Sequence, residues 1–133
     1  MAERISLPGG ELEEAVLACV WSAEQLTVRE IHQRVGEPRG LVYTTVGRVL
    51  DRLLAKGLVA RVLVGRTHMY RAGAERVVVE RAMMRSRVAR LLGIDPLPAM
   101  AALVDAVEEI DAALLDDLAR QIDARRKERG DGA

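Results

Sequence analysis

Four polar side chains in the middle of the chain are separated by three and four residues, and they are Thr44, Thr45, Arg48 and Arg52. In a helix this spacing places side chains on one face. Their hydroxyl and guanidinium groups supply hydrogen-bond donors, but they form no nucleophile–base pair and no set of metal ligands. Such groups bind phosphate oxygens and base edges, and a threonine methyl can contact the thymine methyl. The pattern therefore predicts a face that reads DNA.

Charge is distributed unevenly along the chain, although the formal net charge of the whole sequence is zero. Residues 27–73 contain nine Arg or Lys and three Asp or Glu, which gives this segment a charge of +6. Residues 1–26 carry −4, and residues 95–117 contain seven acids and no base. A basic segment between acidic ones is typical of a protein that meets phosphate with one face. Ordinary solvated surface charge would give the same counts, so charge alone leaves both interpretations open.

Three predicted helices position the polar face. Residues 11–21 have apolar side chains at helical spacing and form the first helix. Thr27 and Glu30 have the spacing of a capping box, which starts a second helix that ends near residue 35, before Gly36 and Pro38. A third helix over residues 42–56 stops at Gly57. Its expected buried stripe consists of Val42, Val46, Val49, Leu50 and Leu53.

The pattern then changes to alternation. Residues 58–64 and 68–72 are predicted strands, joined by a loop at residues 65–67. Three helices followed by a hairpin give a winged helix-turn-helix, whose third helix enters the major groove while the hairpin, or wing, lies along the backbone. The predicted DNA-binding residues are Arg39, Tyr43, Thr44, Thr45, Arg48, Arg52 and Arg66. Two alternatives stay open, namely an intramolecular ion pair near Asp51 for Arg52 and packing against the second helix for Tyr43.

The C-terminal part is predicted to be helical again, over residues 75–92, 99–107 and a last helix that Asp111 caps. The first of these is apolar around much of its circumference, more than a lone surface helix requires. Helices of this size cannot close a core of their own, so we expect them to pair with a second copy. The predicted fold is mostly α with a small two-stranded β wing. Residues 1–73 form a winged-helix DNA-binding domain, and residues 74–133 form a helical dimerisation domain with a basic tail.

The remaining reactive side chains favour structural roles, and the sequence predicts no enzyme, no cofactor and no metal site. Cys19 is the single cysteine, which excludes an internal disulfide, and it falls on the apolar stripe of the first helix. His32 lacks neighbours at metal-ligand spacing, and His68 is expected on a strand surface. No apolar run approaches the roughly 20 residues needed to span a bilayer. The N-terminus lacks a signal-peptide core, so we expect a soluble cytoplasmic protein without membrane insertion.

Three stretches carry a resemblance to a known family: ELEEAVLACVW at residues 11–21, TVREIH at 27–32 and LVYTTVGRVLDRLLAKGLV at 41–59. Together with Arg66, His68 and Tyr70 of the wing, they resemble the BlaI/MecI/CopY penicillinase-repressor family. The similarity is good over residues 8–73 and continues more loosely to about residue 124. It implies a cytoplasmic homodimer that represses transcription from double-stranded operator DNA, with one recognition helix on each half of an inverted repeat. Control of β-lactam-resistance or stress-response genes fits this family.

The signal-receiving half departs from the family pattern. In typical members a membrane sensor metalloprotease responds to β-lactam, and the repressor is then cut at an Asn-Phe dipeptide in its dimerisation domain. The matching place here holds Asp105 and Ala106, which argues against relief by that cleavage. No cysteine follows Cys19, so the metal-sensing cluster of the copper-responsive branch is missing as well. The alternative function is a winged-helix protein–protein interaction module without sequence-specific DNA binding, and the basic segment counts against it.

Overall fold

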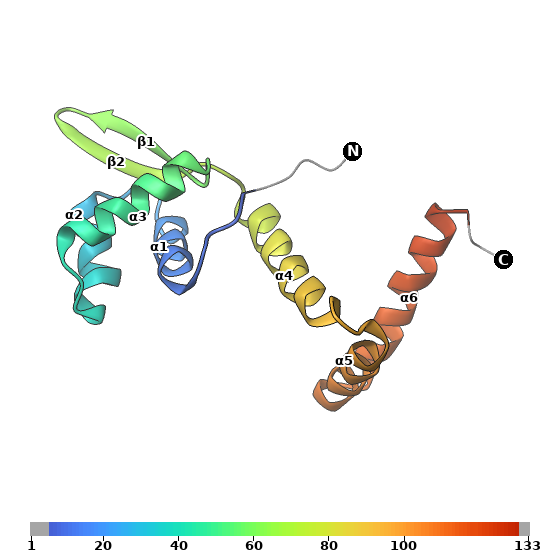
Figure 1. Cartoon of the computed structure of the whole chain (residues 1–133). Helices are drawn as coiled ribbons and strands as arrows, with labels where there is room; N and C mark the ends of the chain where they lie inside the picture. Colours follow the sequence, from blue (N-terminus) through green and yellow to red (C-terminus); the bar gives the residue numbers. More distant parts are fainter. Residues whose placement is uncertain (1–5, 131–133) are drawn as a thin grey trace. The chain divides into compact units, whose positions relative to one another are not determined.

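The computed structural model describes residues 6–130, and within them six α-helices and a two-stranded sheet form (Figure 1). The predicted fold class, mostly helical with a small wing, is confirmed. The chain divides into two compact units, Met1–Arg85 and Ser86–Ala133. The first unit extends beyond residue 73, where the predicted domain boundary lies, because Val79 joins its core. The outermost residues of both predicted domains, 1–5 and 131–133, lie outside the described residues.

The first helices follow the sequence signals closely. Helix α1 is Glu11–Trp21, as predicted, and α2 is Val28–Ile31. The capping box is present: the Glu30 N–H donates to Thr27 Oγ1 at 3.2 Å, and the Thr27 N–H donates to Glu30 Oε1 at 2.9 Å. The chain continues through a π turn, η1 (His32–Gly36), and a 3-10 turn, η2 (Glu37–Arg39). This irregular stretch leads directly to the start of the third helix.

Helix α3 is Tyr43–Ala55 and ends as the glycine signal predicts. Gly57 has φ +75°, and its N–H donates to the Leu54 carbonyl at 3.0 Å. The Leu58 N–H donates to the Leu53 carbonyl at 3.0 Å, which completes a Schellman motif. The prediction for Val42 is wrong: its side chain is 64% exposed. Val42 is the N-cap, with extended backbone at φ −81° and ψ 155°, so its side chain leaves the buried stripe of the helix.

Strands β1 (Val59–Val64) and β2 (Thr67–Ala72) pair antiparallel, with Val64 opposite Thr67. The connection is the two-residue turn Gly65–Arg66, one residue shorter than predicted, with φ +64° at the glycine. An isolated bridge adds Leu26 to the sheet, because the Leu26 N–H donates to the Tyr70 carbonyl at 2.9 Å and the Tyr70 N–H returns a 2.7 Å bond. This bridge fastens the base of the hairpin to the α1–α2 connection.

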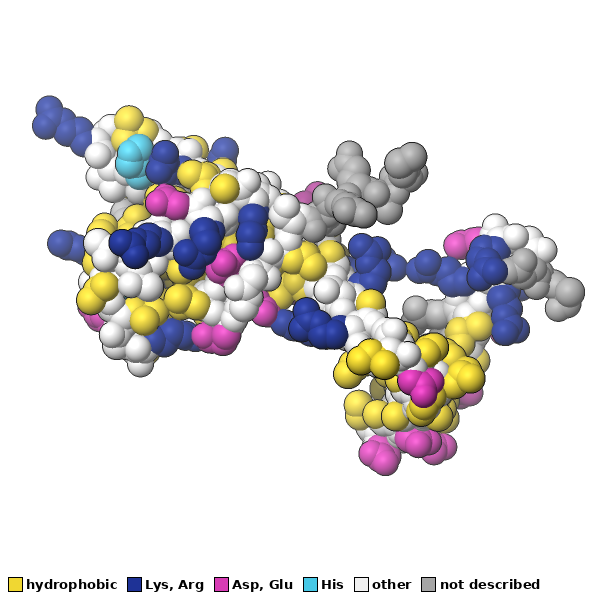
Figure 2. Space-filling model, in the orientation of Figure 1, with side chains coloured by type: hydrophobic (Ala, Val, Ile, Leu, Met, Phe, Trp, Pro, Cys, Tyr) yellow, Lys and Arg dark blue, Asp and Glu magenta, His cyan; other side chains and the backbone are white. Residues whose placement is uncertain are grey.

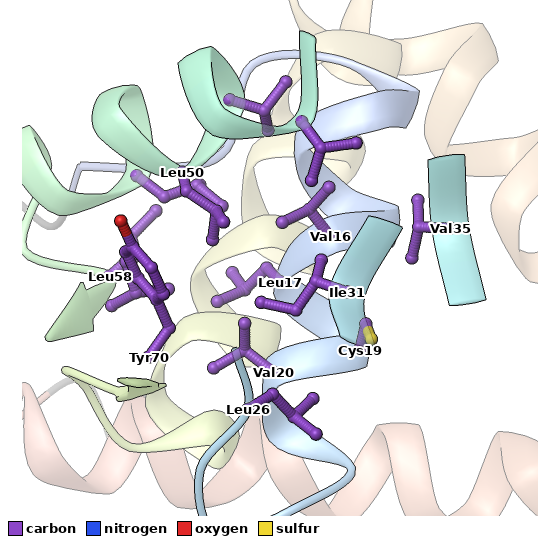
Figure 3. Close-up of a cluster of buried hydrophobic side chains, with 14 of the residues drawn as sticks. Val16, Leu17, Cys19, Val20, Leu26, Ile31, Val35, Leu50, Leu58 and Tyr70 are labelled. Carbon is purple, nitrogen blue, oxygen red and sulfur yellow. The ribbon is translucent and has the colours of Figure 1, made fainter. Parts of the chain in front are cut away.

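The core of the first unit is aliphatic, and Figure 3 shows its side chains converging from the helices and the hairpin. Leu17 and Val20 of α1 meet Ile31 of α2, Leu50 of α3 and Tyr70 of β2 in one cluster. Cys19 is buried there, as predicted. The core therefore holds α3 on one side and leaves the opposite side of that helix at the surface.

The second unit contains the end of α4 (Arg76–Leu92), α5 (Pro96–Ile110) and α6 (Ala113–Glu128). Helix α5 begins three residues earlier than predicted, since Pro96 and Pro98 fall in its first turn, where proline is tolerated. The N-cap of α6 is Ala112 rather than the predicted Asp111, which lies one residue earlier and accepts a 2.9 Å hydrogen bond from the Ala113 N–H through Oδ1. No residue of α5 or α6 is fully buried, and the large apolar side chains at the surface include Leu97, Met100, Leu103, Val104, Ile110, Leu114 and Ile122. Among residues 6–130, no helix combines the length and apolar character needed to cross a bilayer.

Candidate nucleic-acid interface

The face of α3 opposite the core carries most of the polar groups predicted from the sequence. Val46, Val49, Leu50 and Leu53 are buried, whereas Thr44 and Arg48 are exposed and Thr45 is half-buried. Figure 2 shows Lys and Arg side chains gathered over this part of the first unit. The core therefore fixes the helix axis and leaves Thr44 and Arg48 in reach of a ligand.

The N-terminus of α3 has free hydrogen-bond donors. Val42 is the N-cap, and it offers no side-chain oxygen to the first backbone N–H groups of the helix. The first turn contains no acid. The leading N–H groups of a helix lack i−4 partners, and the helix dipole makes this end positive. In α3 the Thr45 N–H donates to the Val42 carbonyl at 3.1 Å, so the N–H groups of Tyr43 and Thr44 are the ones left for a ligand. An uncapped N-terminus on an exposed face suits a phosphate group.

Among the predicted DNA-binding arginines, Arg48 and Arg66 have guanidinium groups that are not engaged by other described residues. Both side chains are exposed, and neither forms an ion pair or hydrogen bond with another residue in the described part of the chain. Arg48 lies on α3, one turn after Thr44, and Arg66 lies at the hairpin turn. A guanidinium with five free N–H donors can bind phosphate or guanine in a bidentate manner.

Arg52 belongs to a cluster around Glu13, a buried acid on α1. Arg52 Nε donates to Glu13 Oε2 at 3.1 Å, and Lys56 Nζ donates to Glu13 Oε1 at 2.7 Å. The Gly9 N–H adds a 3.0 Å bond to the same carboxylate, and Lys56 also reaches the Leu7 carbonyl at 3.1 Å. Of the two alternatives for Arg52, the intramolecular ion pair is present, with Glu13 as the partner rather than a group near Asp51.

The electrostatics of this cluster keep Glu13 ionised. Burial by itself raises the pKa of a carboxyl group. The carboxylate accepts hydrogen bonds from Lys56, Gly9 and Arg52, which outweigh burial, so the pKa of Glu13 lies below its ordinary value. Sequence reasoning missed this residue, although a signal exists: Glu13, Val16, Leu17 and Val20 follow the i, i+3, i+4, i+7 spacing of a buried stripe.

Arg39 also contacts α1. Its Nη2 donates to Glu11 Oε1 at 2.6 Å, and its Nη1 donates to the Val35 carbonyl at 3.1 Å. The hydrogen bond from Arg39 lowers the pKa of Glu11. Arg39 therefore joins η2 to the start of α1, and its guanidinium is partly occupied before any DNA arrives.

Tyr43 packs against the second predicted helix, which is one of the two alternatives left open by the sequence. Its ring packs edge-on against His32, with ring centroids 5.8 Å apart, yet its side chain remains 51% exposed. His32 Nε2 lies 2.9 Å from the Leu41 carbonyl, which can only accept, so this nitrogen carries the proton. Gly36 has no room for a side chain, because a Cβ there would lie 2.6 Å from the His32 ring. These contacts fix the approach of the chain to α3.

The hairpin is more basic than the site prediction assumed. Residues 59–72 contain Arg61, Arg66, Arg71 and His68, all exposed, and no acid. Arg61 and Arg71 were not among the predicted contacts. The signal was available, since a segment of this length without a single Asp or Glu stands out in a chain with 20 acidic residues.

Comparisons with known proteins agree over most of the chain. The family model described as penicillinase repressor matches residues 9–124. The protein called Transcriptional regulator BlaI in two strains of Mycobacterium tuberculosis, CDC 1551 / Oshkosh and ATCC 25618 / H37Rv, is 37% identical over 114 residues, which cover 85% of this chain and 81% of the relative.

Solved structures of other transcriptional regulators are similar to this chain only at low sequence identity and with TM-scores below 0.5. The PcaV regulator of Streptomyces coelicolor has a TM-score of 0.48 and 23% identity, over 83% of this chain and 79% of that one. A MarR family regulator of Silicibacter pomeroyi has a TM-score of 0.44 and 18% identity, over 78% and 71%. The family model and the Mycobacterium tuberculosis relatives show that the chain belongs to the penicillinase-repressor family. It is a BlaI-like winged-helix transcriptional regulator and not an enzyme.

Proposed function

We propose that this protein is a homodimeric repressor that binds an inverted-repeat operator in double-stranded DNA. The observation that carries the proposal is the exposed face at the N-terminal end of α3, where Thr44 and the unengaged Arg48 follow an uncapped helix start. Hydroxyl and guanidinium groups read base edges, and free N–H groups hold a phosphate. In this proposal Thr44, Thr45 and Arg48 enter the major groove, and Tyr43, which is 51% exposed, places its hydroxyl on the DNA backbone.

The two arginines that bind α1 acids have a supporting part in this proposal. Arg52 gives its Nε–H to Glu13 and keeps a side chain that is 54% exposed, so its other N–H groups can reach a phosphate. Arg39 gives N–H groups to Glu11 and to the Val35 carbonyl. Both residues hold α1 against the segments that carry the DNA-binding side chains, and we propose that they also contact phosphates at the edge of that surface. Arg66 would contact DNA separately, from the wing.

The second unit supports the dimer. Its helices α5 and α6 bury no residue fully, while large apolar side chains such as Leu97, Leu103 and Ile110 remain exposed. A surface of this kind marks an interface, and a second copy of the chain is the proposed occupant. A two-fold dimer presents two copies of α3, so its operator should contain inverted half-sites about one helical turn, or a multiple of it, apart.

The genes that we propose this protein controls are those typical of the family, namely β-lactam-resistance or stress-response genes. A membrane sensor metalloprotease is the proposed upstream partner only if it acts other than by cutting Asn-Phe, because the matching positions on α5 are Asp105 and Ala106. Incubating the purified repressor with membranes from β-lactam-treated cells tests this partner. An intact chain that nevertheless leaves its operator supports a route of release without cleavage, whereas a cut at residues 105–106 contradicts it.

A binding experiment tests the proposed function. An operator is selected from a random-sequence pool with the full-length protein, and its affinity is measured over a salt series. Replacing Arg48 with alanine should weaken operator binding about 10-fold. Arg81→Ala removes the same charge from an exposed position on α4 and should bind like the parent. Equal affinities of parent and Arg48→Ala, or selection of no operator at low salt, would show that α3 does not read DNA.

A further inference from the structure

A hollow of about 570 Å³ lies where the base of the hairpin passes into α4. The end of α1 and the connection after it contribute Trp21 and Glu24, the end of β2 contributes Arg71, and the entry to α4 contributes Glu75 and Arg76. All these residues belong to the first unit. Pockets that hold small molecules have volumes of roughly 300–1,000 Å³. The hollow is therefore a candidate binding site that is separate from the face of α3 proposed to read DNA.

Trp21 brings an unsatisfied hydrogen-bond donor to the wall of this hollow. Among residues 6–130, its Nε1 is the one buried side-chain nitrogen or oxygen without a hydrogen-bond partner. The Arg76 guanidinium lies over the same ring, 5.4 Å from the centroid, within the range of a cation–π interaction. Buried donors without an acceptor are rare in folded proteins, because nothing offsets the loss of their contact with water. The chain therefore leaves one acceptor to be supplied from outside.

The charged side chains around the hollow have both signs and do not pair with one another. Arg71, Glu24 and Glu75 are exposed, and none of their side chains forms an ion pair or hydrogen bond within the described part of the chain. Arg76 Nε donates to Glu80 Oε1 at 2.8 Å, outside the hollow. Opposite charges that line one hollow without pairing are complementary to a molecule that carries an anionic and a cationic group.

We propose that this hollow binds a small zwitterion of the amino-acid class. The carboxylate of the ligand accepts hydrogen bonds from the Arg71 guanidinium and, as the exposed Arg76 side chain moves aside, from the Trp21 N–H. The ammonium group of the ligand donates to Glu24 and Glu75. Each charged group of the hollow thereby gains a partner of opposite charge, and the unsatisfied indole N–H gains its acceptor.

The position of the hollow gives the ligand a means of regulation, and this part of the inference rests on the proposed function. Residues 73–75 connect β2 to α4 and line the hollow. A zwitterion held by Arg71 on one side and Glu75 on the other joins the end of β2 to the entry of α4. In the proposed dimer, the direction of α4 affects the distance between the two copies of α3. An operator selected with the ligand-free protein fits the ligand-free distance, so the ligand should weaken binding to that operator.

Fluorescence tests whether the hollow binds such a molecule. Trp21 is the single tryptophan of the chain, so tryptophan emission reports on this site alone. The full-length protein is titrated with each free amino acid except tryptophan and tyrosine, and a saturable change in emission is expected with at least one of them. The N-acetyl and carboxamide derivatives of that amino acid each lack one charge and should bind at least about 10-fold more weakly. No saturable change with any amino acid, or equal binding of the two derivatives, overturns the proposal.

Variants test the side chains that form the site, with calorimetry as the measurement and thermal melting as the check on the fold. Arg71→Gln and Glu75→Gln each remove one proposed charged contact and should weaken binding of the same amino acid about 10-fold. Trp21→Phe keeps an aromatic ring without the N–H and should also bind more weakly. Arg81→Gln removes a charge from an exposed position of α4 outside the hollow and should bind like the parent. Parent-like binding by either charge variant overturns the assignment.

Operator binding separates this inference from the proposed function. A saturating concentration of the amino acid should weaken parent binding to the operator selected without it at least about fivefold, and Glu75→Gln should respond little. Unchanged operator affinity of the ligand-bound parent overturns the regulatory part of the inference. Failure to select any operator identifies failure of the proposed function instead, and the fluorescence titration still decides whether the hollow is a binding site.

Discussion

Lys56, which caps the C-terminus of α3, donates a 2.7 Å hydrogen bond to Glu13, a buried acid on α1. Arg52, one turn earlier on α3, donates to the other oxygen of the same carboxylate. The C-terminal half of α3 is therefore fixed to α1 by charge, while Thr44 and Arg48 of its N-terminal half remain exposed. This division lets one helix be both part of the core and a reading surface.

Replacing Glu13 with glutamine should destabilise the protein by about 2 kcal/mol, because it removes the buried charge that the half-buried Lys56 and the exposed Arg52 share. Chemical denaturation followed by circular dichroism measures this loss. Glu24→Gln, at an exposed position in the α1–α2 connection, is the matched control and should unfold like the parent. Equal free energies of unfolding for parent and Glu13→Gln would show that the cluster around Glu13 does not stabilise the fold.

The same pair of variants predicts a pH dependence. The pKa of Glu13 is lower in the folded protein than its ordinary value of 4.5, so its contribution is complete above that value. The contribution is lost as the pH falls through the pKa of the folded state. The difference in unfolding free energy between parent and Glu13→Gln should therefore be constant near neutral pH and shrink below about pH 4.5. A difference that widened on acidification would have the wrong sign.

Gly73→Ala should cost about 2 kcal/mol of stability. A Cβ at this position would lie 2.8 Å from the Gly57 carbonyl oxygen and 2.8 Å from the Val59 carbonyl carbon, which are backbone atoms without freedom to move. Gly47 is the matched control, because a Cβ there meets nothing within 4 Å and the residue lies inside α3. Gly47→Ala should raise stability by up to about 1 kcal/mol. A thermal melt in which both variants shift in the same direction would refute the packing argument.

Leu103→Asp should convert the proposed dimer to monomer at micromolar concentration, since it places a charge among the exposed apolar side chains of α5. Analytical ultracentrifugation measures the mass, and binding to a two-half-site operator should weaken in parallel. Leu63→Asp makes the same change on the wing and should remain a dimer. A parent that sediments only as monomer contradicts the interface on α5 and α6.

Local signals in the sequence predict the fold well. The bounds of α1, the capping box of Thr27 and Glu30, and the stop at Gly57 each depend on residues within one or two turns. Val42 was misassigned because helical spacing does not show whether the first position of a stripe is inside the helix or caps it. The bridge at Leu26 is a single residue, and one residue shows no alternation.

The candidate site is less accessible to sequence reasoning, because its geometry depends on contacts between distant residues. Thr44 and Arg48 lie on the predicted face, but Arg52 and Arg39 meet acids of α1 that are 39 and 28 positions away. No local pattern pairs these residues. Such ion pairs divide the cations of the basic segment into two groups. Arg52 and Arg39 bind acids of α1 and stabilise the fold, whereas Arg48 remains available to DNA.

The uncapped start of α3 implies that helix stability and operator binding place opposite demands on position 42. Serine at position 42 would give the helix the capping oxygen that Val42 lacks and should stabilise it by about 1 kcal/mol. That oxygen would occupy an N–H that the proposed phosphate contact uses. Selection for heat resistance should therefore favour a capping residue at position 42, whereas selection for tight repression should favour valine. Thermostable variants that change this position should be poor repressors.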